Sequence, residues 1–280
     1  MQKVESHSRA STISELQVRA RRLRLHVLRM AERVGQGYVG QGLDIADLLA
    51  VLYFHEIRYD PHRLDWPDRD RFVLSTGHYS IGLYAALAEA GVIPLDELDT
   101  YGADGSRLEM SGSEFTPGFE MTGGSLGQGL SQAVGMALGL HLDGRDARVF
   151  NLLSDGELQE GATWEAAMAG AYYRLDSLFA FIDCNNQQAD GPPRQVMAVE
   201  PVDEKWAAFG WDTQRINGND IEAIVTAIDA AKTVNGRPHA IVMDTLMGKG
   251  VRLFEQREKA HFIRVGPDEW DLARQQLEAS

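Results

Sequence analysis

Two polar turns, 30 residues apart, hold the side chains of this sequence that are best suited to chemistry. Asp155 and Gly156 follow one apolar stretch, and Asn185 and Gln187 follow the next. Mg²⁺ prefers oxygen ligands and is often held by one or two carboxylates together with phosphate oxygens. The Asp155 carboxylate, the Asn185 amide oxygen and the Gln187 backbone carbonyl could therefore hold a divalent cation whose other ligands are diphosphate oxygens. Gly156 would let the backbone approach such an anion closely.

The segments around these turns predict a unit of strand, loop, helix and strand. Residues 148–153 and 178–183 are short and apolar, which is typical of buried strands, and residues 159–173 form a helical run between them. The carboxyl ends of parallel strands lie at one edge of a sheet, where α/β proteins bind ligands. The amino end of the helix would present free N–H groups to an anion there. Either turn alone could be an ordinary surface turn; the combination favours a binding site.

The remaining patterns predict an α/β fold with a mostly parallel central sheet. Residues 16–34 have apolar side chains at spacings of three and four, which predicts an amphipathic helix with its arginines in water. A glycine-rich loop over 35–42 precedes a helix that Asp44 would cap. We expect residues 1–12 to be flexible and 13–280 to form a single domain. Further strands are expected at 72–75, 211–216 and 240–244, and further helices after His78, after residue 128 and at 220–232.

Two of the predicted helices carry small residues on one face. Ser131, Gly135 and Gly139 recur at intervals of four residues, which places them on the same side of a helix. The helix after Asp155 is likewise rich in small residues, with Ala162, Ala166, Ala169 and Gly170. We expect both small faces to pack closely under the sheet.

Composition argues against several classes of partner. The formal net charge is −14 and the pI is near 5.0, so a nucleic-acid surface is not expected. Cys184 is the single cysteine, which permits no internal disulfide and suits a reducing compartment. The amino-terminal residues lack the apolar stretch of a secretory signal, and no window approaches the roughly 18 apolar residues of a membrane span. We therefore expect a cytoplasmic protein that binds neither nucleic acid nor membranes.

The two turns resemble the thiamine diphosphate signature, which is usually GDG followed by an asparagine. The chain from about residue 69 to 250 resembles the amino-terminal half of transketolases, with matching segments in matching order. The resemblance implies a three-layer thiamine diphosphate-binding fold, with thiamine diphosphate and Mg²⁺ (or Ca²⁺ or Mn²⁺) as cofactors. The matching segments are RDRFVLSTGH (69–78), PGFEMTGGSLGQGLSQAVGMALG (117–139), DGELQEGATWEAAM (155–168), QADG (188–191), KWAAFGWD (205–212) and GKG (248–250).

The resemblance also implies roles for individual residues. Asp155, Asn185 and Gln187 would ligate the metal. A larger set would bind the cofactor: His78, Gly124, Ser125, Leu126, Asp155, Gly156, Glu157, Asn185 and His261.

Four of the implied residues are candidates for catalysis. His78 and His261 would lie beside the reacting atoms, although a lone histidine after a strand is otherwise often structural and His261 lacks the family's WHG context. Glu160 and Glu165 match glutamates at a subunit interface, where buried carboxylates can share protons between two sites. The alternative for Glu165 is an ordinary exposed helix position.

Three positions depart from the family pattern. Tyr38 stands where transketolases usually have the histidine of GHPG, and Ser111 stands where a second histidine is expected. Ser154 replaces the first glycine of GDG. In the family these histidines contact the sugar, so the changes imply a modified or branched substrate such as apulose 4-phosphate. Tyr38 and Ser111 could take the place of the missing histidines.

A full transketolase also has a second cofactor domain and a carboxyl-terminal domain, and no segment of this sequence resembles either of them. The resemblance therefore implies the amino-terminal subunit of a split transketolase that transfers a two-carbon ketol unit between sugar phosphates. A carboxyl-terminal partner would carry the pyrimidine-binding domain and its pyrimidine-facing glutamate, in a heterotetramer of two plus two subunits. Two alternatives stay open: a component of a 2-oxo acid dehydrogenase or decarboxylase, and a non-catalytic scaffold subunit.

Overall fold

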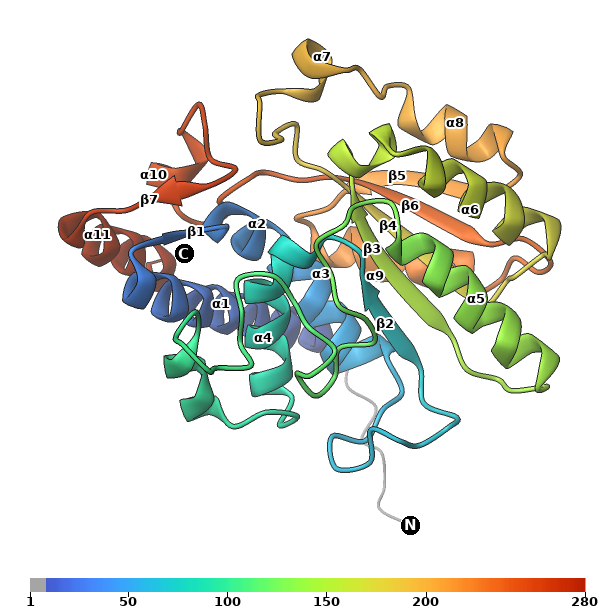
Figure 1. Cartoon of the computed structure of the whole chain (residues 1–280), viewed down its shortest axis with the longest axis horizontal. Coiled ribbons are helices and arrows are strands. Elements are labelled where there is room, and N and C mark those ends of the chain that lie inside the picture. Colours follow the sequence, from blue (N-terminus) through green and yellow to red (C-terminus); the bar gives the residue numbers. More distant parts are fainter. Residues whose placement is uncertain (1–8, 280) are drawn as a thin grey trace.

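A five-stranded parallel sheet forms the centre of the computed structural model, which describes residues 9–279 (Figure 1). Four of its strands are short and mostly apolar, whereas the strand at residues 212–217, on one edge, is polar and partly exposed. The interior strands β3 and β4 are buried almost throughout. In spatial order the strands are β2 (Arg71–Leu74), β3 (Val149–Ser154), β4 (Leu178–Cys184), β6 (His239–Asp244) and β5 (Asp212–Asn217).

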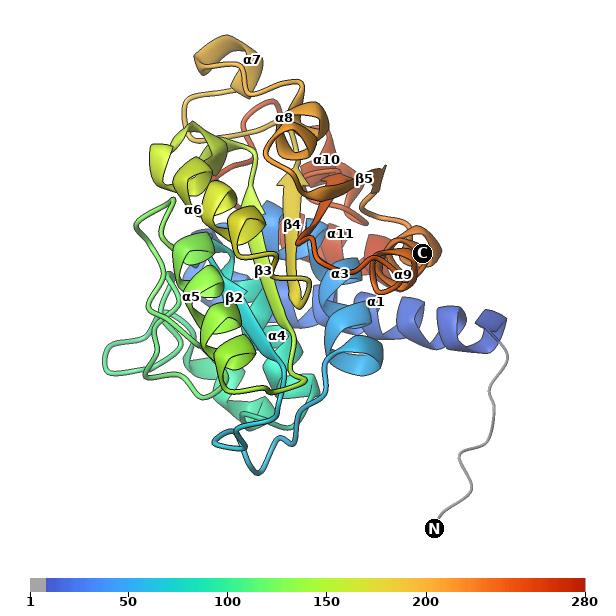
Figure 2. The same ribbon diagram turned by 90° about the vertical axis from the view of Figure 1, so that its right-hand side faces the viewer.

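Helices cover both faces of this sheet, because successive side chains of each buried strand point to opposite faces. In β3, Phe150 and Leu152 join one hydrophobic cluster, whereas Val149 and Leu153 join the other. Figure 2 shows α5 and α6 on one side of the sheet and α3 and α9 on the other. The predicted α/β fold with a parallel sheet between helical layers is confirmed. The helices are α1 (Arg9–Val34), α2 (Val39–Asp44), α3 (Ala46–Val51), α4 (Ser80–Glu89), α5 (Gly129–Leu142), α6 (Gly161–Tyr172), α7 (Pro193–Val196), α8 (Val202–Ala208), α9 (Ile221–Ala231), α10 (Arg252–Glu255) and α11 (Pro267–Glu278).

The first helix differs from its prediction in two respects. It begins at Arg9, so part of the segment predicted to be flexible is helical, while residues 1–8 of that segment lie outside the described residues. Its apolar positions are buried as expected, but not all its arginines face water. Arg24 is 7% exposed and pairs with Asp47 at 2.6 Å across the α1–α3 contact. A buried guanidinium needs such a carboxylate partner, which local periodicity does not reveal.

The glycine-rich segment after α1 is only partly a loop. Residues 39–44 form α2, because Gly40 and Gly42 let this short helix pack against other elements. A Cβ on Gly40 would lie 2.6 Å from the Met247 sulfur, and one on Gly42 would lie 2.7 Å from Ile81. The prediction that Asp44 caps the following helix is wrong. Asp44 ends α2 fully buried, and burial together with Asp183 raises its pKa well above the usual range.

The small faces of the two helices have different surroundings. On α6, Ala166 and Gly170 are buried as expected, and a Cβ on Gly170 would lie 3.1 Å from Trp211. Ala169 is only partly buried, and Ala162 is exposed, contrary to the prediction. On α5 the prediction is wrong, because Ser131, Gly135 and Gly139 face outward into open space. The face of α5 that packs against the sheet contains both small and large apolar side chains, namely Leu130, Ala133, Val134 and Ala137.

Membrane insertion receives no support from the described helices. Within residues 9–279, no helix combines the length and the apolar character that crossing a lipid bilayer requires.

Candidate active site

The two polar turns lie side by side at the carboxyl edge of the sheet. Strands β3 and β4 are parallel neighbours, with Ser154 opposite Asp183. The Asp155 amide donates to the Asp183 carbonyl at 2.9 Å, and the Asn186 amide donates to the Asp155 carboxylate at 3.2 Å. The predicted meeting of the two turns therefore follows directly from strand order and register.

The residues at this meeting point fit a divalent cation. Asp155 and Asn185 are each 5% exposed. Burial, reinforced by the Asp183 carboxylate, raises the pKa of Asp155 to about 7, and a bound cation would favour the ionised form that burial disfavours. Asn186 adopts a left-handed φ of 59°, which bends the chain sharply between Asn185 and Gln187. The metal assignment to Asp155, Asn185 and Gln187 stays a prediction.

This candidate cation site contains few carboxylates. Within residues 9–279, no three histidine, cysteine, aspartate or glutamate side chains converge as a metal centre would require. The predicted protein ligands are one carboxylate, one amide and one backbone carbonyl. Such a set leaves several coordination positions for phosphate oxygens or water, as is common for Mg²⁺.

The segment after Asp155 corrects the predicted helix over 159–173. Residues 156–159 form a short 3₁₀ helix, η4, and α6 begins only at Gly161. The Asp155 side chain accepts from the Gly156 amide at 2.7 Å, which starts the 3₁₀ turn, and Glu160 has extended dihedral angles that interrupt the helix. Gly156 and the η4 turn, rather than the amino end of α6, therefore lie next to the predicted metal ligand Asp155.

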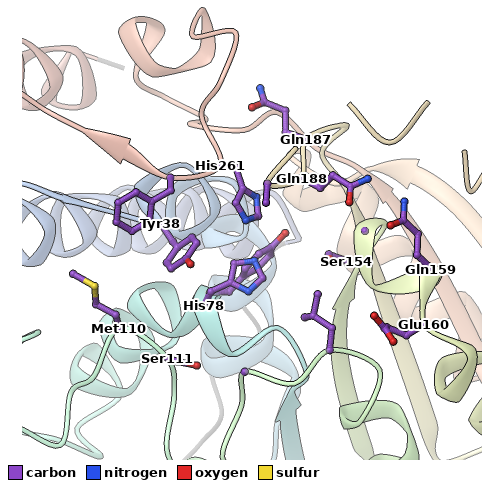
Figure 3. Close-up of a pocket in the computed structure, with 16 residues that line it drawn as sticks. Tyr38, His78, Met110, Ser111, Ser154, Gln159, Glu160, Gln187, Gln188 and His261 are labelled. Carbon is purple, nitrogen blue, oxygen red and sulfur yellow. The ribbon is translucent and has the colours of Figure 1, made fainter. Parts of the chain in front are cut away.

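A cavity of about 540 Å³ opens beside these turns (Figure 3). It is lined by residues that are far apart in the sequence, including residues at the start of α2, in η4 and at 261–262. Seven of the predicted site residues line it: His78, Gly124, Leu126, Gly156, Glu160, Gln187 and His261.

An aromatic cluster forms one wall of the cavity. The short strands β1 (Gln36–Gly37) and β7 (Ile263–Arg264) pair antiparallel, which brings Tyr38 next to His261. The Tyr38 ring lies 4.9 Å from the His78 ring, measured between centroids, and 5.1 Å from the Phe262 ring. The residue at the position of the missing histidine therefore contacts both histidines that remain.

Burial favours the neutral form of both histidines. Burial, together with the neighbouring His261, lowers the pKa of His78 to about 3, and burial lowers the pKa of His261. Gln41 Nε2 lies 3.1 Å from His261 Nδ1 and donates to the His261 carbonyl at 2.7 Å. Because an amide N–H can only donate, His261 Nδ1 is an acceptor here and its proton resides on Nε2. Neutral imidazoles can both donate and accept a proton.

The glycine loop before α5 is held by direct backbone packing. A Cβ on Gly77 would lie 2.5 Å from backbone atoms of Gly123 and Gly124, and one on Gly123 would lie 2.4 Å from the Gly77 Cα. No side chain larger than glycine fits either position without displacing the backbone. The LSTGH and GGSLGQG segments are therefore two sides of one contact, which places His78 and Gly124 at the same cavity.

Four predicted residues lie outside the cavity wall, besides the buried Asp155. Asn185 is buried, Ser125 is exposed and accepts from the Gln128 side chain, and Glu165 is exposed on α6. The Glu157 side chain, predicted to bind the cofactor, turns instead into the protein. Its carboxylate accepts from the Gly127 amide at 2.7 Å and from the Ser75 hydroxyl, so it fastens the glycine loop to the end of β2.

Gln188 and Tyr79 line the cavity, although sequence reasoning did not single them out. Buried polar atoms that lack a hydrogen-bond partner among the described residues include Ser111 Oγ and Gln188 Nε2 in the cavity wall. Such atoms are costly unless a ligand or water satisfies them, so they fit a polar ligand beside the cation site. Tyr79 bonds Asp183 at 2.7 Å. The sequence feature that could have pointed to this contact is Asp183, a charged residue within an otherwise apolar strand.

Fold and site together define an α/β cofactor-binding domain whose candidate cation site lies at the carboxyl edge of a parallel sheet. Residues 16–280 match the family model described as transketolase, thiamine diphosphate binding domain. The chain belongs to this family. The match favours the transketolase interpretation over a component of a 2-oxo acid dehydrogenase.

Curated relatives of similar length include subunits of transketolases. The chain is 56% identical over 263 residues to a transketolase family protein of Sinorhizobium fredii, covering 93% of this chain and 94% of the relative. It is 42% identical to the 6-deoxy-6-sulfo-D-fructose transketolase subunit of a Clostridium species, covering 94% of this chain and 96% of the relative. It is 37% identical to an apulose-4-phosphate transketolase subunit of Actinobacillus succinogenes, with the same coverage of both chains.

Solved transketolases share the fold but are longer. The transketolase of Campylobacter jejuni superposes with a TM-score of 0.88 at 31% identity, covering 95% of this chain and 43% of that one. The transketolase of Pichia stipitis in complex with sedoheptulose 7-phosphate gives a TM-score of 0.88 at 28% identity, covering 95% and 41%. This chain therefore spans about two fifths of the solved transketolases that it matches.

Proposed function

We propose that this protein is the diphosphate-binding subunit of a two-subunit, Mg²⁺-dependent transketolase that acts on a modified sugar. The observation that carries the proposal is the junction of Asp155 with the Asn185 turn beside a polar cavity lined by two histidines. Relatives named as transketolase subunits, matched over nearly their whole length, support the division into two chains.

The residues of this chain would bind and orient the cofactor and assist proton movement. Thiamine diphosphate, when bound, supplies the stabilisation of a carbanion that lets a C–C bond beside a carbonyl break. Asp155, Asn185 and the Gln187 carbonyl would hold the cation, and through it the diphosphate. The His261 and His78 rings would donate or accept a proton at a substrate oxygen.

Two observations favour a modified substrate. Tyr38 and Phe262 form one wall of the cavity, and a tyrosine at position 38 makes this wall less polar than a histidine would. Two relatives carry the names of a sulfonated deoxy sugar and of a branched sugar phosphate, and these share altered sugar chemistry rather than one structure. Because a site built for one pattern of hydroxyl groups rejects analogues that lack its contacts, such changes can alter selectivity strongly.

An assay of the reconstituted pair tests this proposal. The chain, combined with a partner from a neighbouring open reading frame, would be offered xylulose 5-phosphate with ribose 5-phosphate, apulose 4-phosphate, 6-deoxy-6-sulfofructose and 2-oxo acids. We expect one modified sugar to exceed xylulose 5-phosphate in kcat/KM by about 10-fold or more. Equal turnover of ordinary sugars would refute the specialised substrate, and turnover of 2-oxo acids alone would refute ketol transfer.

The outward face of α5 and α6 would be a contact between subunits. Gly135 and Gly139 have open space around them, and the face also exposes Leu142 (76%), Met168 (53%) and Tyr172 (79%). An exposed surface that combines small and large apolar residues is typical of protein interfaces. Its position beside Glu160 and Glu165 supports the expectation that these glutamates lie between subunits of a two-plus-two assembly.

A lysine on this face should disrupt assembly without harming the chain. We expect Gly135→Lys to weaken association with the partner or a second copy at least about 10-fold, because a charged side chain would be buried unpaired. The isolated variant should be as stable as the wild type or more stable, since glycine inside a helix costs roughly 1 kcal/mol relative to good helix formers. Analytical ultracentrifugation and thermal unfolding measure the two effects.

Ala230→Lys provides a matched control for this experiment. Ala230 is an exposed small residue of α9, on the other side of the sheet. Its substitution should leave the assembly unchanged. Normal association of Gly135→Lys would show that the α5 and α6 face is not the contact.

A further inference from the structure

We propose that Asp183 is the positioning residue that fixes the predicted metal ligand Asn185 with its amide oxygen turned toward the cation site. This inference rests on the proposed metal site and adds a residue that is not itself a ligand. Asp183 is fully buried at the carboxyl end of β4.

Three contacts determine the orientation of the Asn185 amide. Its Nδ2 donates to Asp183 Oδ2 at 2.6 Å and to the Tyr79 hydroxyl at 2.9 Å. Its Oδ1 accepts from the Gln187 amide at 3.0 Å. In the flipped amide, an oxygen would face the Asp183 carboxylate and an NH₂ group would face the Gln187 N–H. Both contacts would be repulsive, so the oxygen is held on the Gln187 side of the turn.

Asp183 is itself held rigidly and contacts both polar turns. Tyr79 donates to the same Oδ2 at 2.7 Å, and the Thr245 hydroxyl donates to Oδ1. The Asp183 carbonyl accepts from the Asp155 amide at 2.9 Å. One buried residue therefore orients the asparagine through its side chain and anchors the aspartate through its backbone. Partners of this kind commonly change metal affinity by about 10-fold to 100-fold when removed.

Substitutions at Asp183 separate orientation from charge. In Asp183→Asn, the new amide oxygen can accept from Tyr79 and Asn185, and its NH₂ group can face the Thr245 hydroxyl, so the orientation survives although the charge is lost. In Asp183→Ala, nothing prevents the Asn185 amide from turning. Tyr79→Phe removes one of the two acceptors of Nδ2 and should have an intermediate effect. Thr245→Val is the matched control, because Thr245 contacts the other Asp183 oxygen and not Asn185.

The experiment measures Mn²⁺ affinity of the full chain with saturating thiamine diphosphate, using electron paramagnetic resonance of free Mn²⁺. We expect Asp183→Ala to weaken Mn²⁺ binding about 10-fold to 100-fold, and Asp183→Asn and Thr245→Val to remain within about 3-fold of the wild type. Thermal unfolding without metal is recorded for each variant. Should Asp183→Ala fail to fold, Tyr79→Phe carries the test, with an expected loss of about 3-fold to 10-fold.

Each contrary outcome has a separate meaning. Wild-type chain that binds no Mn²⁺ would overturn the proposed metal site, and this inference with it. Wild-type binding with undiminished affinity in Asp183→Ala and Tyr79→Phe would overturn the inference and leave the metal site standing. Equal losses in Asp183→Ala and Asp183→Asn would assign the effect to charge, and an equal loss in Thr245→Val would assign it to general packing; either result would also overturn the inference.

Discussion

Replacing Asp155 by alanine should abolish Mg²⁺-dependent binding of thiamine diphosphate by the reconstituted pair. Asp155 is the single carboxylate of the predicted ligand set, and the remaining ligands are neutral oxygens. Loss of the one charged ligand should weaken cofactor binding about 100-fold or more, and ketol transfer should become undetectable. Isothermal titration calorimetry at several Mg²⁺ concentrations, together with product analysis, measures both effects.

The fold of the Asp155→Ala variant should survive. Burial raises the pKa of Asp155 to about 7, so removing this carboxylate relieves the cost of a buried charge, while the Gly156 and Asn186 amides lose an acceptor. Because these effects oppose each other, the thermal midpoint of the metal-free protein should fall only modestly. Asp203→Ala, at a partly exposed residue of α8, is the control and should bind cofactor normally. Magnesium-dependent binding that persists in Asp155→Ala would refute the proposed site.

The second large effect concerns the chain by itself. We expect the purified chain to bind Mg²⁺ and thiamine diphosphate weakly and to show no ketol transfer, whereas addition of the partner should restore turnover. Glu160 is the one carboxylate among the residues that line the described cavity, and the resemblance to transketolases assigns cofactor activation to a glutamate of the other cofactor domain. Carbanion chemistry without that group should be too slow to detect.

Two controls show whether the activity requires both chains. The partner alone should also be inactive, and the partner mixed with the Asp155→Ala variant should stay inactive, which excludes a contaminating enzyme. Activity should rise with added partner until the two chains are equimolar. Full ketol-transfer activity of the purified chain without a partner would contradict the proposed division of labour.

Much of the architecture could be predicted from local patterns. Strands β3, β4 and β6 lie within one residue of their predicted bounds, and α9 begins after Asp220, whose side chain caps it. These elements could be predicted because a buried strand or amphipathic helix needs apolar side chains at a fixed period, and polar or glycine residues where it ends. The meeting of Asp155 with the Asn185 turn followed from the same reasoning, since parallel neighbours end at one edge.

Other features depend on contacts between distant segments. Glu157 looked like a cofactor ligand, yet it fastens Gly127 to Ser75, and Asp44 looked like a helix cap, yet it is fully buried. Arg24 is buried because Asp47 lies opposite it. Local sequence gives the type of a side chain but not which distant residue it will contact. The burial and the partners of Glu157, Asp44 and Arg24 could therefore not be predicted from periodicity.

The amino-acid sequence alone determined the parallel α/β fold, the family and the pairing of two polar turns, because these follow from short-range periodicity and from motifs whose residue types suit one chemistry. Tertiary structure decided which glycines pack inside and which face outward, and how Tyr38 meets His78 and His261. It also brought Tyr79, Asp183 and Asn185 into one hydrogen-bonded group across more than 100 residues of chain. The physical reason is that close packing joins surfaces of separate elements, and their complementarity exists only once those elements have met.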